Sequence, residues 1–298
     1  MPKHFLLALA LLCSFTLAAQ LPNTQVYVFD FQVRDTTVLL SRPKYLTNFN
    51  RRGYNNQPSW INNNQLLMSV RVPGQAQPDI YHFDLGRNAR TRLTSTEAGE
   101  YSPKPIGSGD RFSAIRQEYL GQDTVLRLWD FPVNLENNGR PVFKYLNGIG
   151  YYEWLNSVQL ALYQVENPSV LSIASTDNDQ ARPLATNVGR CFKRQPNGNL
   201  AFVDKSSRPW AIREQNLYRM DETPTRITEV LDGSEDFAIL SDGSYLMGQG
   251  SQLYRYDPIR NPRWVQVADL RLYGIRNITR LETNNAGRLA LVADVARR

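Results

Sequence analysis

The chain has 298 residues, of which 42% are hydrophobic and 11% aromatic, and this composition excludes an intrinsically disordered protein. Its net charge of +6 is spread along the sequence without any run of five like charges, so no nucleic-acid partner is indicated. With two histidines and two cysteines in all, a zinc site built from clusters of these residues is excluded by count.

The first 19 residues have the pattern of a secretory signal peptide. Lys3 precedes an apolar stretch from Phe5 to Leu12, and small residues follow before position 20. We therefore expect residues 1–19 to be removed and residues 20–298 to form a single domain. The protein is expected to be exported, to the periplasm or to the outside of the cell.

Cys13 raises the alternative of a lipid anchor. However, Leu12 occupies the position where a lipidation signal needs a small residue, so anchoring is not favoured. No later segment approaches 18 consecutive apolar residues, so we expect no membrane span. Only Cys191 remains after cleavage, and an internal disulfide is then impossible.

A strand, a polar turn and an apolar strand recur along the rest of the chain, which is typical of a repeated β-hairpin. The first example is the Asn62-Asn63-Asn64 turn that precedes the apolar run Gln65 to Val70. The second strands of the six hairpins begin, by this pattern, at Gln65, Arg111, Gln159, Asn199, Ser244 and Arg288. The spacing of 40 to 48 residues predicts one stacked unit per hairpin.

Six further segments alternate apolar and polar residues, and most of them close on an acidic residue. They are residues 26–31, 79–85, 125–131, 169–175, 216–222 and 252–258. Because these segments interleave with the hairpins, each unit is expected to hold four strands.

The two ends of the chain carry incomplete units. Residues 25–47 hold only the last two strands of a unit, and residues 278–295 hold only the first two. We therefore predict an all-β, six-bladed β-propeller in which Gly287–Asp294 pairs with Gln25–Phe31 inside one blade. A two-sheet sandwich is the alternative, but it would not require this period to be kept six times. We expect Trp60 and Trp154, near the starts of inner strands, to pack between blades.

Several short motifs resemble the repeat of TolB-like propeller proteins, which are exported bacterial proteins. They are Leu46-Thr47, Gln57-Pro58-Ser59-Trp60, Asp79-Ile80-Tyr81, Arg92-Leu93-Thr94 and the Ser241-Asp242-Gly243 turn. The similarity covers the chain beyond the leader, and the turn motif is degraded in most copies. The resemblance implies the propeller architecture, and it implies a binding scaffold by analogy alone.

The sequence offers few groups for catalysis. His82 lies in an alternating strand, and no Gly-x-Ser-x-Gly elbow exists, so no catalytic residue is assigned. Asp177-Asn178-Asp179 fits a hairpin turn better than a calcium loop, because the glycine and distal glutamate of an EF-hand are missing. Cys191 is expected to be a packed residue rather than a reactive thiol. We expect no metal and no cofactor.

The loops that enter the innermost strands each carry a glycine followed by polar or aromatic residues. In a propeller such loops converge on one mouth of the central channel, where we place the binding site. The candidate residues are Tyr54, Asn55, Glu100, Tyr101, Tyr151, Tyr152, Glu153, Arg190, Glu235, Asp236, Arg276 and Asn277. The alternative is that these residues only form turns and that the channel holds water.

Three functions fit these features. The first is an exported, monomeric binding or scaffold module that takes an envelope protein or peptide at the channel mouth. The second is a histidine-free carbohydrate-active or calcium-dependent hydrolase in which carboxylates such as Glu100 and Glu235 act as acid and base. The third is a sensor domain. Facing carboxylates with one raised pKa would favour the hydrolase, whereas scattered carboxylates paired with Arg190 and Arg276 would favour binding.

Overall fold

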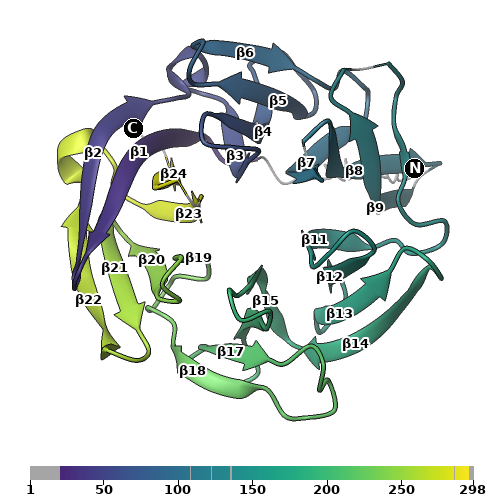
Figure 1. The fold of residues 1–298 in the computed structure, drawn as a ribbon. Coiled ribbons are helices and arrows are strands. Elements are labelled where there is room, and N and C mark those ends of the chain that lie inside the picture. The colour runs from purple at the N-terminus through teal and green to yellow at the C-terminus, as the bar shows by residue number, and fades with distance from the viewer. Residues whose placement is uncertain (1–20, 108, 122, 135, 285, 295–298) are drawn as a thin grey trace, which may run out of the picture.

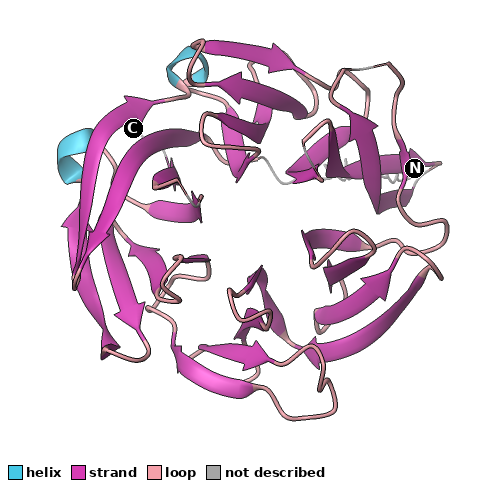
Figure 2. Ribbon diagram, in the orientation of Figure 1, coloured by secondary structure: helices cyan, strands magenta, loops and turns pink. Residues whose placement is uncertain are grey.

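The chain forms a ring of six four-stranded antiparallel sheets arranged around a central axis (Figures 1 and 2). The computed structural model describes residues 21–107, 109–121, 123–134, 136–284 and 286–294. The expected signal peptide lies outside these residues. The six-bladed β-propeller predicted from the repeats is confirmed.

Each blade supplies one strand to each of four concentric layers. The inner strands are β3 (Tyr54–Trp60), β7 (Gly99–Ile106), β11 (Ile149–Trp154), β15 (Val188–Arg194), β19 (Phe237–Ile239) and β23 (Ile278–Thr283). The second strands are β4 (Gln65–Arg71), β8 (Arg111–Leu120), β12 (Gln159–Gln164), β16 (Leu200–Asp204), β20 (Tyr245–Gln249) and β24 (Arg288–Asp294). Their starts agree with the predicted hairpins to within one residue.

The two outer layers complete the blades. The third strands are β5 (Asp79–Asp84), β9 (Asp123–Pro132), β13 (Val170–Ser175), β17 (Ala211–Gln215), β21 (Gln252–Asp257) and β1 (Thr24–Arg34). The outer strands are β6 (Ala89–Arg92), β10 (Arg140–Pro141), β14 (Gln180–Thr186), β18 (Thr225–Glu229), β22 (Asn261–Asp269) and β2 (Thr37–Tyr45). Two short 3-10 helices, η1 (Asn48–Asn50) and η2 (Arg271–Tyr273), join blades. No helix in the described ranges has the length and apolarity needed to cross a membrane.

The ring closes where the two ends of the chain share a blade. The order of that sheet is β2-β1-β24-β23, and its antiparallel register runs from Thr24 opposite Asp294 to Asp30 opposite Arg288. The backbone N–H of Phe31 also donates to the carbonyl of Gly287 at 2.7 Å. The predicted closure is confirmed, and it leaves neither terminal strand as an open sheet edge.

Apolar clusters hold neighbouring blades together. Trp60 of β3 is 8% exposed and packs against Val26 of β1 and Val292 of β24 in the next blade. The indole N–H of Trp154 donates to Ser113 Oγ of the preceding blade at 2.9 Å. Both tryptophans therefore pack between blades, as expected.

One predicted strand is misplaced. Residues 216–222 form a turn rather than the third strand of their blade, because Asn216 Oδ1 accepts a hydrogen bond from the Tyr218 N–H at 2.9 Å and bends the chain. Tyr218 is 90% exposed. The strand is instead β17, whose buried residues Ala211 and Ile212 fit the sheet.

Candidate functional site

The six inner strands run in the same direction along the channel, which gives the ring two distinct faces. We call the end at which the inner strands begin the entry face, and the end at which they turn into the second strands the hairpin face. A cleft of about 660 Å³ opens on the entry face between three blades. It shares Arg190, Asp236 and Arg280 with a smaller cavity of about 70 Å³ inside the ring, to which all six blades contribute. The entry cleft thus leads into this channel cavity.

A third pocket, of about 510 Å³, lies on the hairpin face. It shares Lys104, Glu153 and Glu282 with the channel cavity. The three spaces therefore follow one another along the channel, and charged side chains stand at both boundaries.

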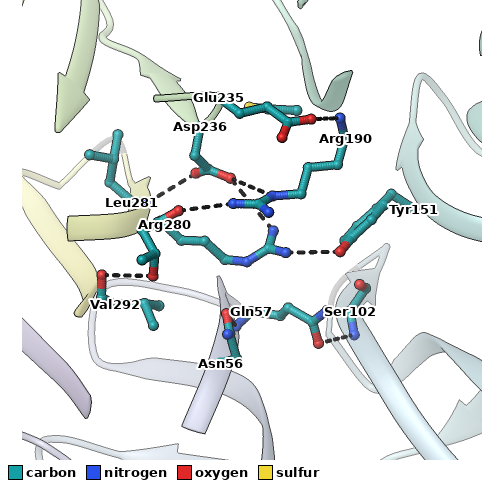
Figure 3. Close-up of polar contacts among 12 residues, drawn as sticks. Asn56, Gln57, Ser102, Tyr151, Arg190, Glu235, Asp236, Arg280, Leu281 and Val292 are labelled. Atoms are coloured by element: carbon teal, nitrogen blue, oxygen red, sulfur yellow. Dashed lines mark hydrogen bonds and ion pairs between the residues drawn. The ribbon is translucent and has the colours of Figure 1, made fainter. Parts of the chain in front are cut away.

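Irregular backbone in the inner strands directs side chains into the channel. The register is interrupted within five of the inner strands: β3, β7, β11, β15 and β23. At two of these breaks, Gln57 (φ 57°) and Ser102 (φ 52°) take a left-handed conformation just before a proline. The Ser102 N–H donates to Gln57 Oε1 at 2.9 Å across the blade boundary (Figure 3). Such conformations are uncommon for residues other than glycine and cluster at functional sites.

Two arginines share one carboxylate where the channel cavity meets the entry cleft (Figure 3). Arg280 Nη1 lies 3.5 Å from Asp236 Oδ2, and Arg190 Nε lies 4.0 Å from the same oxygen. Asp236 Oδ1 accepts the Leu281 N–H at 3.1 Å, which fixes the carboxylate. Arg280 Nη2 donates to Tyr151 Oη at 3.0 Å. We call Arg190, Arg280, Asp236 and Tyr151 the guanidinium layer.

A belt of alternating charge lies nearer the hairpin face. Lys104 Nζ is 2.7 Å from Glu153 Oε2, and Lys193 is hydrogen-bonded to Glu282. Burial raises the pKa of Glu153, but Lys104 and Lys193 outweigh burial and hold that pKa below its usual value. Burial lowers the pKa of Lys193, yet Glu282 and Glu153 hold it above its usual range. These four groups, the charge belt, compensate one another within the channel.

The structure brings together seven of the twelve predicted site residues. Five of them, Tyr151, Tyr152, Glu153, Arg190 and Asp236, line the channel cavity, whereas Glu235 and Asn277 line the entry cleft beside it. The other five line neither space: Tyr54, Asn55, Glu100, Tyr101 and Arg276. Eight of the twelve lie inside inner strands rather than in the loops where they were expected: Tyr54, Asn55, Glu100, Tyr101, Tyr151, Tyr152, Glu153 and Arg190.

Glu100 is the clearest correction. Its side chain is fully buried in β7, where it accepts hydrogen bonds from Thr96 Oγ1 at 2.7 Å, Thr94 Oγ1 at 3.1 Å and Arg116 Nε at 3.1 Å. Burial raises its pKa. The carboxylate supports the blade and does not reach the channel mouth.

Asn55 and Tyr152 also have structural contacts. Asn55 is fully buried, and its amide donates to the carbonyls of Thr24 and Asn50 at 2.7 and 3.0 Å. Tyr152, although it borders the channel cavity, is 2% exposed, and its hydroxyl donates to Ser113 Oγ at 2.9 Å. Arg276, in contrast, is exposed on the entry face outside the cleft.

Several channel residues were missed from the sequence. They are Gln57, Ser102, Lys104, Lys193, Arg280 and Glu282. Each lies within an inner strand, two to five residues beyond the position at which its strand begins. The Gln-Pro-Ser and Ser-Pro-Lys sequences at residues 57–59 and 102–104 are the signals that mark two of the bulges.

The three carboxylates that line the channel cavity, and Glu235 of the entry cleft, are paired with cations. Asp236 faces two arginines, Glu153 and Glu282 belong to the charge belt, and Glu235 Oε1 lies 3.3 Å from Lys205 Nζ. Of the two arginines expected to pair with carboxylates, Arg190 lies beside Asp236, whereas Arg276 lies outside the cleft. Within the described ranges, no group of three or more His, Cys, Asp and Glu side chains is positioned to hold a metal ion.

The Cys191 thiol borders the channel cavity but is 5% exposed. Its sulfur accepts the Phe237 N–H and donates to the Phe237 carbonyl, both at 3.3 Å. Burial raises its pKa above the usual range, which keeps it in the less reactive thiol form. This environment agrees with the packed residue expected from the sequence.

Comparison with known proteins gives matches at the level of structure alone. No protein-family profile and no curated protein sequence matches the chain. A solved structure of a putative TolB from Agrobacterium tumefaciens is similar, with a TM-score of 0.67, 12% identity, and coverage of 93% of this chain and 99% of that one.

Two further solved structures share the architecture. TolB from Acinetobacter baumannii has a TM-score of 0.56 at 12% identity, covering 91% of this chain and 64% of that one. A chain from a nidogen–laminin complex has a TM-score of 0.57 at 10% identity, covering 91% of this chain and 98% of that one. At such identities the likeness shows the fold, and function has to be argued from the site.

Proposed function

We propose that the protein is an exported, TolB-like binding module that captures a protein or peptide of the cell envelope at its entry face. The observation that carries this proposal is the entry cleft of about 660 Å³, which three blades line and which continues into the channel cavity. A cleft of this size on a rigid ring suits an inserted peptide segment or a projecting loop.

The chemistry of the cleft supports a polypeptide partner. Trp210 lines one wall, with the ammonium of Lys205 and the guanidinium of Arg208 at 4.2 and 5.1 Å from the centre of its ring. Asp232 and Glu235 contribute charges of the opposite sign. Tryptophan and arginine dominate the binding energy of protein interfaces, and surrounding charges of both signs select the partner and its orientation.

Two further observations support the envelope as the location. The leader-like sequence at residues 1–19 predicts export, and the similar solved structures include a TolB and a putative TolB.

The pairing of the channel carboxylates with cations supports a binding role over the hydrolase considered from the sequence.

Obstruction of the cleft tests the proposal. Asp232 is exposed on the loop before β19, so Asp232→Trp should fill the cleft without disturbing the blade. Asn63→Trp, at an exposed turn on the hairpin face, is the matched control. The purified protein would be used to capture envelope proteins, and the affinity of each captured protein would then be measured for both variants.

We expect Asp232→Trp to weaken capture at least about tenfold, a loss typical of one important interface residue, and Asn63→Trp to leave it unchanged. If Asn63→Trp weakens capture more than Asp232→Trp, or if both variants bind equally well, the entry face is not the binding surface.

A further inference from the structure

The channel cavity carries an imbalance of charge. Its lining includes four cations, Lys104, Arg190, Lys193 and Arg280, against three carboxylates, Glu153, Asp236 and Glu282. In the charge belt two cations face two carboxylates. The excess positive charge therefore belongs to the guanidinium layer, where Arg190 and Arg280 share Asp236 as their counter-ion.

The neighbouring carboxylate does not remove this excess. Glu235 accepts the backbone N–H of Arg190 and pairs with Lys205 at 3.3 Å, so its charge is already compensated. Tyr151 accepts a hydrogen bond from Arg280 and adds no carboxylate to the layer. One unit of positive charge is thus left facing a partly dehydrated cavity, an arrangement that favours an anion.

Two buried donors around the same cavity have no hydrogen-bond partner within the described residues. One is Arg190 Nε, and the other is the Ser102 hydroxyl, whose residue is 7% exposed. Ser102 is held in place by its left-handed backbone and by its N–H bond to Gln57. Both residues line the channel cavity, although they come from different blades. Unsatisfied buried donors are costly, and they are explained by a group that accepts hydrogen bonds there.

We propose that the channel cavity binds a carboxylate of the captured partner, held by Arg190, Arg280 and the Ser102 hydroxyl. This inference rests on the proposed function, since the partner reaches the cavity through the entry cleft. A cavity of about 70 Å³ admits such a group, because one water molecule needs only about 10–15 Å³ on the same measure. A carboxylate oxygen accepts from guanidinium and hydroxyl donors alike.

The size of the charge imbalance selects the kind of anion. One negative charge compensates the guanidinium layer. A dianionic phosphate monoester would bring a second negative charge, which the carboxylates of Asp236, Glu153 and Glu282 would repel. The carboxylate has two possible sources in a polypeptide: an aspartate or glutamate side chain, or the chain terminus.

Short peptides that differ in one group provide the test. The probes are acetyl-Gly-Gly-Gly with a free terminal carboxylate, acetyl-Gly-Asp-Gly-amide with a side-chain carboxylate, and acetyl-Gly-Gly-Gly-amide with none. Each is titrated into the full exported chain, and the shifts of backbone amide NMR signals are followed because they register weak binding. We expect saturable binding of at least one carboxylate probe, with the largest shifts at Ser102 and Leu281, and no binding of the uncharged peptide.

Variants separate binding from stability. Arg280→Gln and Ser102→Ala should each weaken the carboxylate probe about tenfold or more, while Arg276→Gln, an exposed arginine on the same face, should not. Ser102→Ala removes a hydroxyl that has no hydrogen-bond partner among the described residues, so it should retain the melting temperature of the wild type. It therefore remains informative if Arg280→Gln fails to fold.

The outcomes distinguish this inference from the proposed function. If the uncharged peptide binds as well as the others, if neither carboxylate probe binds, or if Ser102→Ala binds like the wild type, the carboxylate site is refuted. If the carboxylate peptides do not bind but Asp232→Trp still loses partner capture, this inference is overturned and the proposed function stands. Binding of the probes, with partner capture intact in Asp232→Trp, would support the carboxylate site and overturn the proposed function.

Discussion

Removal of the Glu100 carboxylate should destabilise the propeller strongly, although the sequence suggested that this residue lies in a loop at the channel mouth. The side chain is 0% exposed, and its partner Arg116 is 10% exposed. In Glu100→Ala the Arg116 guanidinium would stay buried, 4.1 Å from the ring centre of Trp129, without its counter-ion. Breaking a buried ion pair on one side costs about 3–5 kcal/mol. The variant also loses the hydrogen bonds that Thr94 and Thr96 donate to Glu100. Because these bonds belong to the same network as the ion pair, their free energies are not added to this cost.

Urea unfolding followed by circular dichroism measures this cost. Glu97→Ala is the matched control, because Glu97 is exposed three residues earlier and its removal should change the free energy of unfolding by no more than about 0.5 kcal/mol. The double variant Glu100→Ala, Arg116→Met should recover part of the loss, since the stranded charge is gone. An unchanged urea midpoint in Glu100→Ala would refute the structural role assigned to this pair.

Three further predictions address packing, closure and pH. Trp60→Ala should cost about 3–5 kcal/mol in urea unfolding, whereas the same change at the 90% exposed Tyr218 should cost little, and equal losses would contradict interblade packing. Deletion of residues 278–298 removes two strands of the closing blade, so the truncated chain should lose its cooperative thermal transition, and an unchanged melting temperature would rule out terminal closure. Glu153 has a lowered pKa in the fold, so its contribution to stability is present above its usual pKa of 4.5 and is lost as the pH falls through the folded value. Glu153→Gln should therefore flatten the loss of stability below about pH 4.5 in acid titrations, and a slope as steep as that of the wild type would contradict the role of the charge belt.

The architecture was predictable because its signals are local. Turns such as Asn62-Asn63-Asn64 and the apolar strands after them repeat in sequence, and each blade is built from neighbouring segments. Ring closure followed from two half-units, which left one physical way to complete the sixth sheet. An alternating apolar and polar pattern is not sufficient to predict a strand. Residues 216–222 have this pattern, but a hydrogen bond to the Asn216 side chain bends the backbone there.

The candidate site was predictable only in part. The converging loops were expected over residues that belong to the inner strands, so Glu100 was included although its side chain is buried in the blade. Ser102 and Arg280 lie at bulges of these strands and were missed. The ion-pair partners of the site could not be predicted from the sequence either. Glu235 pairs with Lys205 of another blade, and Asp236 lies between arginines of two further strands. Contacts of this kind depend on the ring geometry and not on sequence distance.

Photo-crosslinking in the native envelope would show which face of the propeller holds a partner. A photoreactive amino acid would be placed at position 232 on the entry face or at position 63 on the hairpin face, and the crosslinked peptides would be identified by mass spectrometry. We expect a specific polypeptide to be crosslinked at position 232 and not at position 63, and this crosslink to be lost when Arg190 is replaced by glutamine. A specific crosslink at position 63 alone, or one at position 232 that survives Arg190→Gln undiminished, would contradict this expectation.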